Sequence, residues 1–419
     1  MTAVAAALTL QDVRRRGRVR TVTTLFGPAF VASVAYVDPG NFATNFAGGA
    51  QHGYQLVWVI LMANLMAIVV QYLTSKAGLA TGRSLPELCR DRYGRRANFV
   101  LWLQAEVVAM ATDLAEFVGA AVGLNLVFGI PLLPAGLITA VVAFGVLALE
   151  QRGYRRFERA VIALLAFVGA GFVYVFLAAG GQNVGQIAAG VVPRIGGGDQ
   201  LSLTVGIIGA TVMPHVVYLH SALQKRRIQA TDPAERQTLL SYNRWDCIVG
   251  LGLAGAVNLS MLCIAAALFH QSGRPDVDGL DAIHAQLGQL VGGGAALAFG
   301  VALMASGLSS SSVGTYAGQV VMAGFMNWRI PLLVRRLLTM LPSLFVLAVA
   351  ADTSQALVLS QIVLSFGIPF ALVPLLLVTR DRRLMKDMAN RRQTNAAMLL
   401  ITVVITSLNV YLLVDTVLG

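Results

Sequence analysis

Long apolar stretches, separated by short polar breaks, follow one another along almost the whole chain. A helix needs roughly 20 mostly apolar residues to cross the hydrocarbon core of a bilayer, and these stretches have about that length. The pattern predicts eleven membrane-spanning helices, near residues 25–47, 55–75, 98–126, 132–149, 160–178, 201–223, 246–269, 293–322, 331–350, 355–379 and 396–416. We therefore expect an all-α polytopic membrane protein without a sizeable soluble domain.

The composition supports the same class. Of the 419 residues, 57% are apolar and 12% are charged, whereas soluble chains have about 45–50% apolar and about 25% charged residues. The three cysteines, Cys89, Cys247 and Cys263, are scattered and give neither a metal-site spacing nor a disulfide framework. We expect no enzymatic activity and no cofactor.

The net charge of +11 would suggest nucleic acid as a partner if the chain were soluble. If the N-terminus is cytoplasmic, however, every lysine and arginine except Arg194 and Arg274 falls on the cytoplasmic side of the predicted spans. This asymmetry is the positive-inside pattern of membrane proteins. It predicts a cytoplasmic N-terminus, an external C-terminus and no nucleic-acid partner. The excess of arginine over lysine suggests the plasma membrane of a GC-rich bacterium.

An internal repeat is visible around two prolines in the middle of predicted spans one and six. Spans one to five and spans six to ten enter the membrane from opposite sides, and the prolines lie 175 residues apart. The pairs that match at this offset are Ala35 with Ala210, Val37 with Val212, and Pro39 with Pro214. Two inverted five-helix halves, each opening with an interrupted helix, are typical of secondary transporters that bind their substrate at the midplane.

This repeat divides the chain into four parts. We expect a cytoplasmic N-terminal arm at 1–24, a first repeat at 25–178, a second repeat at 200–379 and an eleventh helix at 395–417.

Each proline removes one helical hydrogen bond, because proline has no N–H group. Pro39 thereby frees the carbonyl of Ala35, and Pro214 frees the carbonyl of Ala210. In hydrocarbon, a free carbonyl is tolerated only where protein, water or an ion satisfies it. The two freed carbonyls are equivalent positions of the repeat.

Three side chains with suitable donor atoms lie beside those carbonyls. Asp38 offers a carboxylate, Asn41 an amide oxygen and Met213 a thioether. With the main-chain carbonyls they form a ligand set for a divalent cation, and an Asp in mid-membrane without a partner would be costly. The alternative is a pair of proline kinks whose polar residues only satisfy each other.

A family resemblance follows from these motifs. Asp38-Pro39-Gly40-Asn41 and Met213-Pro214-His215 resemble the paired signatures of the Nramp family of proton-coupled divalent metal transporters, called MntH in bacteria. The resemblance extends over the whole chain and includes residues 111–116 in span three and the pair Arg335-Arg336 in span nine.

The resemblance implies a LeuT-type fold and symport of protons with Mn²⁺ or Fe²⁺, with Cd²⁺, Co²⁺ and Zn²⁺ tolerated. The metal ligands it implies are the side chains of Asp38, Asn41 and Met213 and the carbonyls of Ala35 and Ala210. It also implies that Gln361 in span ten approaches the ion when the site is occluded. The partners we expect are therefore divalent transition-metal ions, protons and the lipid bilayer, with the protein as a monomer.

Three acidic residues of span three, Glu106, Asp113 and Glu116, are spaced so that they fall on one helical face. A stripe of carboxylates inside a bundle usually marks an ion or proton path. The resemblance implies that Asp113 and Glu116 carry protons away from Asp38 toward the cytoplasm, with Arg335 and Arg336 pairing along the way. A static network of ion pairs is the alternative.

His215 is a second candidate for proton transfer, because histidine has an unperturbed pKa near neutrality. A hydrogen-bonded packing role is equally compatible with its position.

Two other classes of function fit these residues less well. An organic-solute carrier of similar fold would have to place an anionic substrate beside Asp38, which would repel it. An intramembrane aspartyl protease needs a Gly-x-Gly-Asp motif, which the sequence lacks. The sequence therefore favours a transporter of divalent metal ions.

Overall fold

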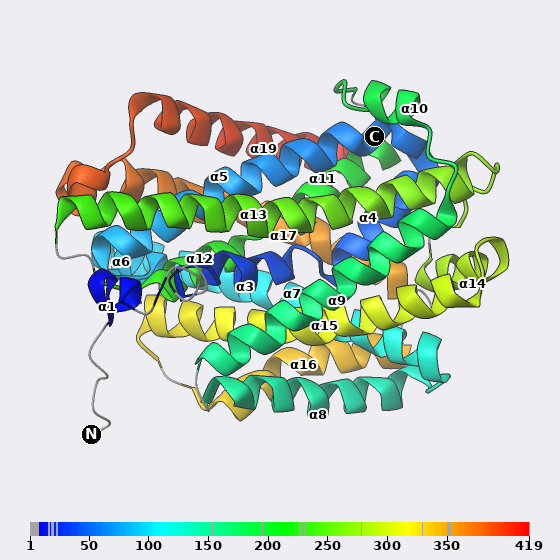
Figure 1. Ribbon diagram of the computed structural model, residues 1–419, viewed down its shortest axis with the longest axis horizontal. Coiled ribbons are helices and arrows are strands. Elements are labelled where there is room, and N and C mark those ends of the chain that lie inside the picture. Colours follow the sequence, from blue (N-terminus) through cyan, green and yellow to red (C-terminus); the bar gives the residue numbers. More distant parts are fainter. Residues whose placement is uncertain are drawn as a thin grey trace.

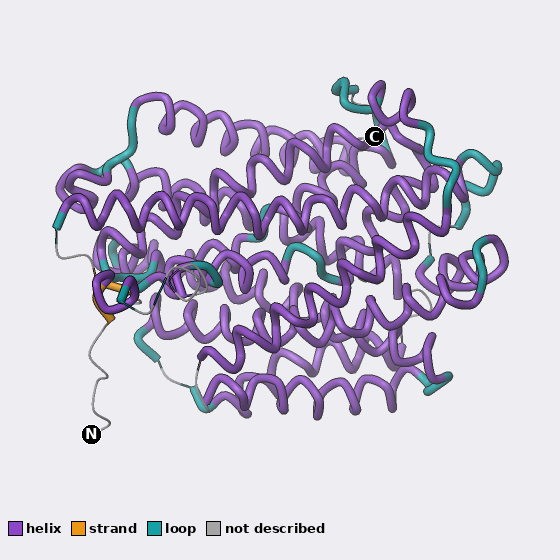
Figure 2. Tube along the Cα trace, in the orientation of Figure 1, coloured by secondary structure: helices purple, strands orange, loops and turns teal. Residues whose placement is uncertain are grey.

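The protein is a bundle of long helices that run side by side along its longest axis (Figure 1). The computed structural model describes residues 8–15, 17, 21, 24–151, 154–194, 196–225, 228–229, 232–277, 279–328, 330–349 and 353–418. Helices make up nearly all of this part of the chain (Figure 2), which confirms the expected all-α class. Within it, the strands are a two-residue parallel pair, β1 (Leu8–Thr9) with β2 (Ile228–Gln229).

The long helices follow the predicted spans in order. Those of the first half are α3 (Pro28–Ala35), α4 (Pro39–His52), α5 (Val57–Thr81), α7 (Arg95–Phe128), α8 (Leu132–Gln151) and α9 (Tyr154–Ala179). Those of the second half are α11 (Asp199–Thr211), α12 (Pro214–Gln224), α13 (Pro233–Ala265), α15 (Gly293–Val321), α16 (Leu332–Val349), α17 (Thr353–Thr379) and α19 (Arg392–Leu418).

Shorter elements connect the long helices at the two ends of the bundle. One end carries α1 (Leu10–Arg14), α6 (Leu85–Arg92), η3 (Met322–Met326), α18 (Arg382–Met385) and η4 (Lys386–Met388). The other end carries η1 (Gly53–Leu56), α10 (Val184–Ala189), η2 (Ala266–His270) and α14 (Leu280–Leu290). Figure 1 shows α1 and α6 at one end and α10 and α14 at the other, with α19 running toward the second end.

All eleven predicted spans coincide with helices. Eight helical stretches of the described chain are long and apolar enough to cross a membrane. The difference of three has a simple origin. Helices α4 and α5 run on as one stretch, Pro39–Thr81, and the apolar parts described in α8 and α16 are shorter, Leu132–Gly145 and Leu337–Val349.

The first and sixth spans are interrupted where the prolines predicted a break. Helix α3 ends at Ala35 and α4 begins at Pro39, while α11 ends at Thr211 and α12 begins at Pro214. The second half-helices therefore start 175 residues apart, at the offset of the sequence repeat. Half-helix α4 packs against α11, and α3 packs against α12, so the two breaks lie next to each other.

These broken helices occupy the centre of the bundle. Helices α11 and α12 are almost wholly buried, whereas α9 and α19 lie at the periphery. Large apolar side chains such as Leu177 on α9 and Leu400 on α19 point outward, with 73% and 64% of their surface exposed. An apolar exterior around a buried, partly polar centre is the arrangement that a lipid environment requires.

Candidate functional site at the interrupted helices

Asp38 and Met213 occupy equivalent places at the two breaks. Each is the residue directly before the first turn of a half-helix, Asp38 for α4 and Met213 for α12, and each has an extended backbone. Both side chains are fully buried. The sequence places them there because Pro39 and Pro214 are well suited to the first position of a helix, where no N–H is needed.

The two carboxylate oxygens of Asp38 have different surroundings. Oδ1 accepts hydrogen bonds from the backbone N–H of Asn41 (2.9 Å) and from its Nδ2 (2.6 Å), so it caps the start of α4. No donor in the described part of the chain reaches Oδ2. One oxygen therefore secures the helix end, and the other is left for a ligand.

Asn41 joins the two repeats at this point. Its Nδ2 also donates to the carbonyl of Ala210 (3.0 Å), the group that Pro214 leaves without its helical partner. The Oδ1 atom of Asn41 is buried and has no hydrogen-bond donor among the described residues. The side chains of Asp38 and Asn41 and the carbonyl of Ala210 are thus brought together as the sequence predicted.

Gln361 approaches the same break from α17. It is fully buried, and a Cβ atom added to Gly40 would collide with its side-chain amide. Its Nε2 donates to Ser360 (3.0 Å), while its Oε1 has no donor in the described chain. Gly40 therefore allows the closest approach of α17 to the start of α4.

The ends of the first half-helices add backbone charge to the site. Ala35 is the last residue of α3 and Ala210 lies in the last turn of α11. The C-terminal ends of helices carry partial negative charge. Two such ends therefore favour a cation between them, and Asp38 offsets the partial positive charge at the start of α4.

The site contains few charged ligands. No cluster of three or more His, Cys, Asp or Glu residues that could hold a metal occurs within the described ranges. A cation bound here would rely on one carboxylate, with amide and main-chain oxygens and a thioether completing its shell.

The acidic stripe of α7 extends away from this centre. Asp113 and Glu116 are buried, and Glu106 lies nearer the end that carries α6. Arg335 of α16 holds Glu106 with two hydrogen bonds (3.1 and 2.8 Å), and Trp102 adds a third (3.2 Å). The predicted pairing of Arg335 is therefore present, whereas the side chain of Arg336 lies outside the described residues.

Two glycines of α15 make room for this polar group. A Cβ on Gly314 would collide with, or press closely on, the carboxylate of Glu116, and one on Gly318 would collide with the guanidinium of Arg335. Small residues in a membrane-spanning helix favour close helix packing. They do allow close packing, but the neighbours they admit are charged side chains.

His215 connects α12 to the same helix. Its Nδ1 lies 3.2 Å from the hydroxyl of Thr112, next to Asp113 in the sequence, and its Nε2 has no partner in the described chain. His215 therefore lies between the break in span six and the acidic stripe.

The sequence analysis did not find a group of hydrogen-bonded polar side chains around Tyr36, at the break in span one. Gln71 of α5 donates to the hydroxyl of Tyr36 (2.6 Å), and its Oε1 lies 2.9 Å from Nδ1 of His220. Asn258 of α13 donates to the carbonyl of Tyr36 (2.8 Å). Mid-span Gln71 and Asn258 were the available signal, since polar residues inside spans are rarely without a role.

Asp246 is a second residue that the sequence analysis missed. It lies fully buried on α13 and accepts from the backbone N–H groups of Gly27 (3.0 Å) and Ala29 (2.9 Å). It thereby caps α3 from a position more than 200 residues away and fixes the first half-helix to span seven.

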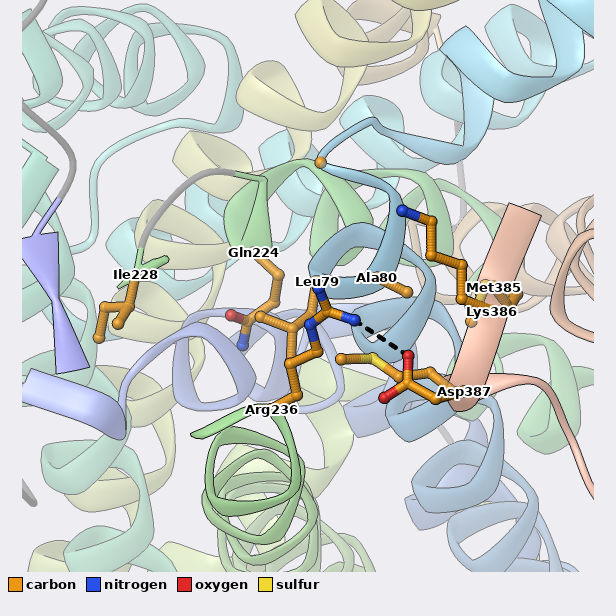
Figure 3. A pocket seen from close by; sticks show the side chains of 10 residues that line it. Leu79, Ala80, Gln224, Ile228, Arg236, Met385, Lys386 and Asp387 are labelled. Atoms are coloured by element: carbon orange, nitrogen blue, oxygen red, sulfur yellow. Dashed lines mark hydrogen bonds and ion pairs between the residues drawn. The ribbon is translucent and has the colours of Figure 1, made fainter. Parts of the chain in front are cut away.

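A cavity of about 300 Å³ opens at the end of the bundle that carries α18. Figure 3 shows side chains of α5, α12, α13 and α18 around it, among them Leu79, Gln224 and Met385. Arg236 Nη1 lies 3.1 Å from Asp387 Oδ1 across its rim. Asp38, Asn41, Met213 and Gln361 are all fully buried and do not line this cavity.

Comparison with known proteins gives a consistent result over the whole chain. Residues 29–415 match the family described as "Natural resistance-associated macrophage protein-like", Nramp. The chain is 49% identical to the divalent metal cation transporter MntH of Deinococcus radiodurans over 97% of this chain and 93% of that one. It is 46% identical to MntH of Bacillus subtilis, covering 97% and 95% of the two chains.

Solved structures agree with these relatives. The crystal structure of the Eremococcus coleocola manganese transporter in complex with an aromatic bis-isothiourea compound superimposes with a TM-score of 0.86 at 31% identity, covering 98% of this chain and 89% of that one. Mhp1, a nucleobase-cation-symport-1 family transporter, has a TM-score of 0.59 at 14% identity, covering 88% and 81%, and supports the LeuT-type fold alone. Since the relatives are named as transporters, the expectation of a non-enzymatic protein is confirmed. The chain belongs to the Nramp family.

Proposed function

We propose that this protein imports Mn²⁺ by proton symport and alternating access across the plasma membrane of a bacterium. Fe²⁺ is a second substrate, and Cd²⁺, Co²⁺ and Zn²⁺ are tolerated. The relatives named as divalent metal or manganese transporters support the metal substrate. In this proposal the chain acts as a monomer with a cytoplasmic N-terminus and an external C-terminus.

The observation that carries the metal site is a pair of buried oxygens without donors. Asp38 Oδ2 and Asn41 Oδ1 lie at the same helix end, fully buried, and no described donor satisfies them. Leaving buried polar atoms unpaired costs free energy, about 1–3 kcal/mol each. A divalent ion that accepts electron pairs from both oxygens would remove that cost.

The amide nitrogen of Asn41 contacts two oxygens that a bound cation would also contact. Its Nδ2 group carries partial positive charge and donates hydrogen bonds both to Asp38 Oδ1 and to the carbonyl of Ala210. In our proposal an arriving ion displaces this amide and turns Asn41 Oδ1 toward itself. The carbonyl of Ala35, the thioether of Met213 and finally Gln361 complete the shell as the site closes.

Protons follow a separate route in this proposal. A carboxylate must be deprotonated to bind a metal, so binding at Asp38 releases or excludes a proton. We assign its path to His215, Asp113, Glu116 and Glu106, with Arg335 and Arg336 balancing the negative charge. The contact between His215 and Thr112 supports a route from α12 onto α7.

Alternating access fits the division of the chain into two repeats. We assign residues 25–178 and 200–379 to the inverted repeats, preceded by the arm at 1–24 and followed by the helix at 395–417. Each repeat supplies one interrupted helix to the site. Movement of one repeat against the other would open the site first to one side and then to the other.

Uptake into proteoliposomes tests the proposal. With the outside more acidic than the inside, we expect Mn²⁺ to accumulate faster than at equal pH. Asp38→Asn should abolish uptake but preserve the fold, because asparagine also caps helices well. Asp113→Asn should lower Mn²⁺-stimulated proton entry more than it lowers Mn²⁺ binding.

Three results would contradict the proposal in different ways. Absence of Mn²⁺ uptake by the parent protein would exclude the substrate. Parental uptake by Asp38→Asn would exclude the ligand assignment. Mn²⁺ uptake without any proton entry, at every imposed gradient, would exclude symport.

A further inference from the structure

Two cavities lie one after the other along α9, at the periphery of the bundle. Near the start of the helix, a cavity of about 530 Å³ lies between α9 and the segment that enters α3. Farther along, a second cavity of about 610 Å³ lies between α9 and α13. The lining residues that matter here are Phe26 before α3, Phe30 in α3, and Ile162, Ala166, Gly169 and Ala170 on α9.

The two cavities share one helical face. Arg155, Arg159 and Ile162 line the first, and Ala166, Gly169, Ala170 and Val173 line the second. Apart from the adjacent pair Gly169 and Ala170, these positions follow one another at intervals of three or four residues, so they lie above one another along α9. The face is therefore basic at its start and apolar beyond, with small residues where the groove passes α13.

The basic end concentrates positive charge at the rim. Nε of Arg159 donates to the backbone carbonyl of Arg155 (3.2 Å), which holds its guanidinium back toward the first turn of α9. Both arginines are exposed. Like charges one helical turn apart repel each other, and the start of a helix adds partial positive charge. Glu158, which also lines this cavity, is only 7% exposed, whereas both arginines are exposed.

We propose that this face of α9 binds one anionic phospholipid of the cytoplasmic leaflet. Its phosphodiester lies on the guanidinium groups of Arg155 and Arg159, which match phosphate oxygens in a bidentate manner. One acyl chain lies along the groove from Ile162 to Ala170. Basic pockets beside membrane helices on the cytoplasmic side are typical sites for anionic lipid headgroups.

The dimensions agree with a lipid that belongs to a single leaflet. Half of the hydrocarbon core is roughly 15 Å thick, which corresponds to about ten residues of helix. A chain that begins at the level of Arg159 therefore ends near Gly169 and Ala170, where the groove is lined by small side chains. A free phosphate ion would use the arginines but not this apolar groove.

Native mass spectrometry of the full chain, released from membranes in mild detergent, tests the proposal. After incubation with equal amounts of phosphatidylglycerol and phosphatidylcholine, the parent protein should retain phosphatidylglycerol. Each positive charge near a membrane surface contributes about a fivefold gain in affinity, so Arg155→Gln/Arg159→Gln should weaken retention roughly 30-fold. Ala170→Trp, which fills the groove but keeps both arginines, should also lower retention.

The matched control is Arg95→Gln/Arg96→Gln at the start of α7. These arginines are exposed at the same end of the bundle and do not line the α9 cavities, so their replacement removes the same charge without touching the groove. Its retention should equal that of the parent. If both double variants lost the same amount of bound phosphatidylglycerol, net charge alone would explain the effect, and the proposed site on α9 would be wrong. If inorganic phosphate displaced the lipid completely, or if Ala170→Trp retained as much lipid as the parent, the occupant of the α9 site would not be a phospholipid.

Discussion

At the scale of single residues, the central site depends on how two helix-capping positions are used. Asp38 caps α4 with one carboxylate oxygen and leaves the other without a described donor. Met213 takes the equivalent place before α12 but has no charge and cannot cap with an oxygen. In the proposed site, one half of the repeat would thus supply a hard ligand and the other a soft one.

We predict that Met213 sets selectivity more than affinity. Sulfur is accepted by Mn²⁺, Fe²⁺ and especially Cd²⁺, whereas Ca²⁺ and Mg²⁺ prefer oxygen ligands. Met213→Ala leaves space for a water oxygen. The variant should retain some Mn²⁺ uptake, lose much of its Cd²⁺ affinity and become sensitive to competition by Ca²⁺ or Mg²⁺ in uptake assays. Equal depression of all ions, with an unchanged order of preference, would mean that Met213 only fills space beside Pro214.

At the scale of the elements, a buried ion pair joins α7 to α16 beside α15. Arg335 and Glu106 are 5% and 14% exposed, and Gly318 of α15 leaves the space that the guanidinium occupies. Burying two charges is costly, but leaving one of them unpaired is worse. The pair therefore fixes α16 against α7 beside the acidic stripe.

A double-mutant cycle tests that role. Glu106→Gln leaves Arg335 buried without its carboxylate and should destabilise the protein by about 3–5 kcal/mol. Glu106→Gln/Arg335→Gln should recover part of this loss, as measured by unfolding in detergent. The exposed pair Arg236 and Asp387 is the control, because Asp387→Asn should cost at most about 1 kcal/mol. Arg335→Gln completes the cycle, and costs of the two single variants that simply add up in the double variant would show that the two charges are not coupled.

Much of the element scale could be predicted from local sequence. The apolar stretches gave the eleven spans, and Pro39 and Pro214 gave the breaks, because a missing N–H acts on the residues next to it. Contacts between distant segments could not be predicted in this way. Asp246 reaches the start of α3 across more than 200 residues, and nothing around Asp246 in the sequence indicates which helix end it caps. In the same way, nothing around Tyr36, Gln71 or His220 in the sequence indicates that these three side chains contact one another.

At the scale of the whole molecule, charge distinguishes the two ends of the bundle. Arg194 and Arg274 belong to the end with α10 and α14, and every other lysine or arginine belongs to the opposite end or to the segments predicted on that side. Cytoplasmic loops of membrane proteins are enriched in these residues. The end with α1 and α6 is therefore expected to face the cytoplasm.

Cysteine labelling tests this orientation, because Cys89, Cys247 and Cys263 are all buried and should react little. In intact cells, a membrane-impermeant maleimide should label Gly197→Cys, which lies in an exposed loop near α10. Arg391→Cys, exposed before α19, should be labelled only after the cells are made permeable. The reverse pattern would invert the proposed topology.

The central claim is that a divalent ion binds where the four half-helix ends meet. Anomalous X-ray diffraction from crystals of the protein soaked in Mn²⁺ tests it most directly, because the signal gives the position of the metal itself. We expect one strong peak in contact with Asp38 Oδ2 and Met213 Sδ, and its loss in Asp38→Asn crystals. A peak elsewhere in the bundle that persists in Asp38→Asn, with none at the breaks, would contradict it.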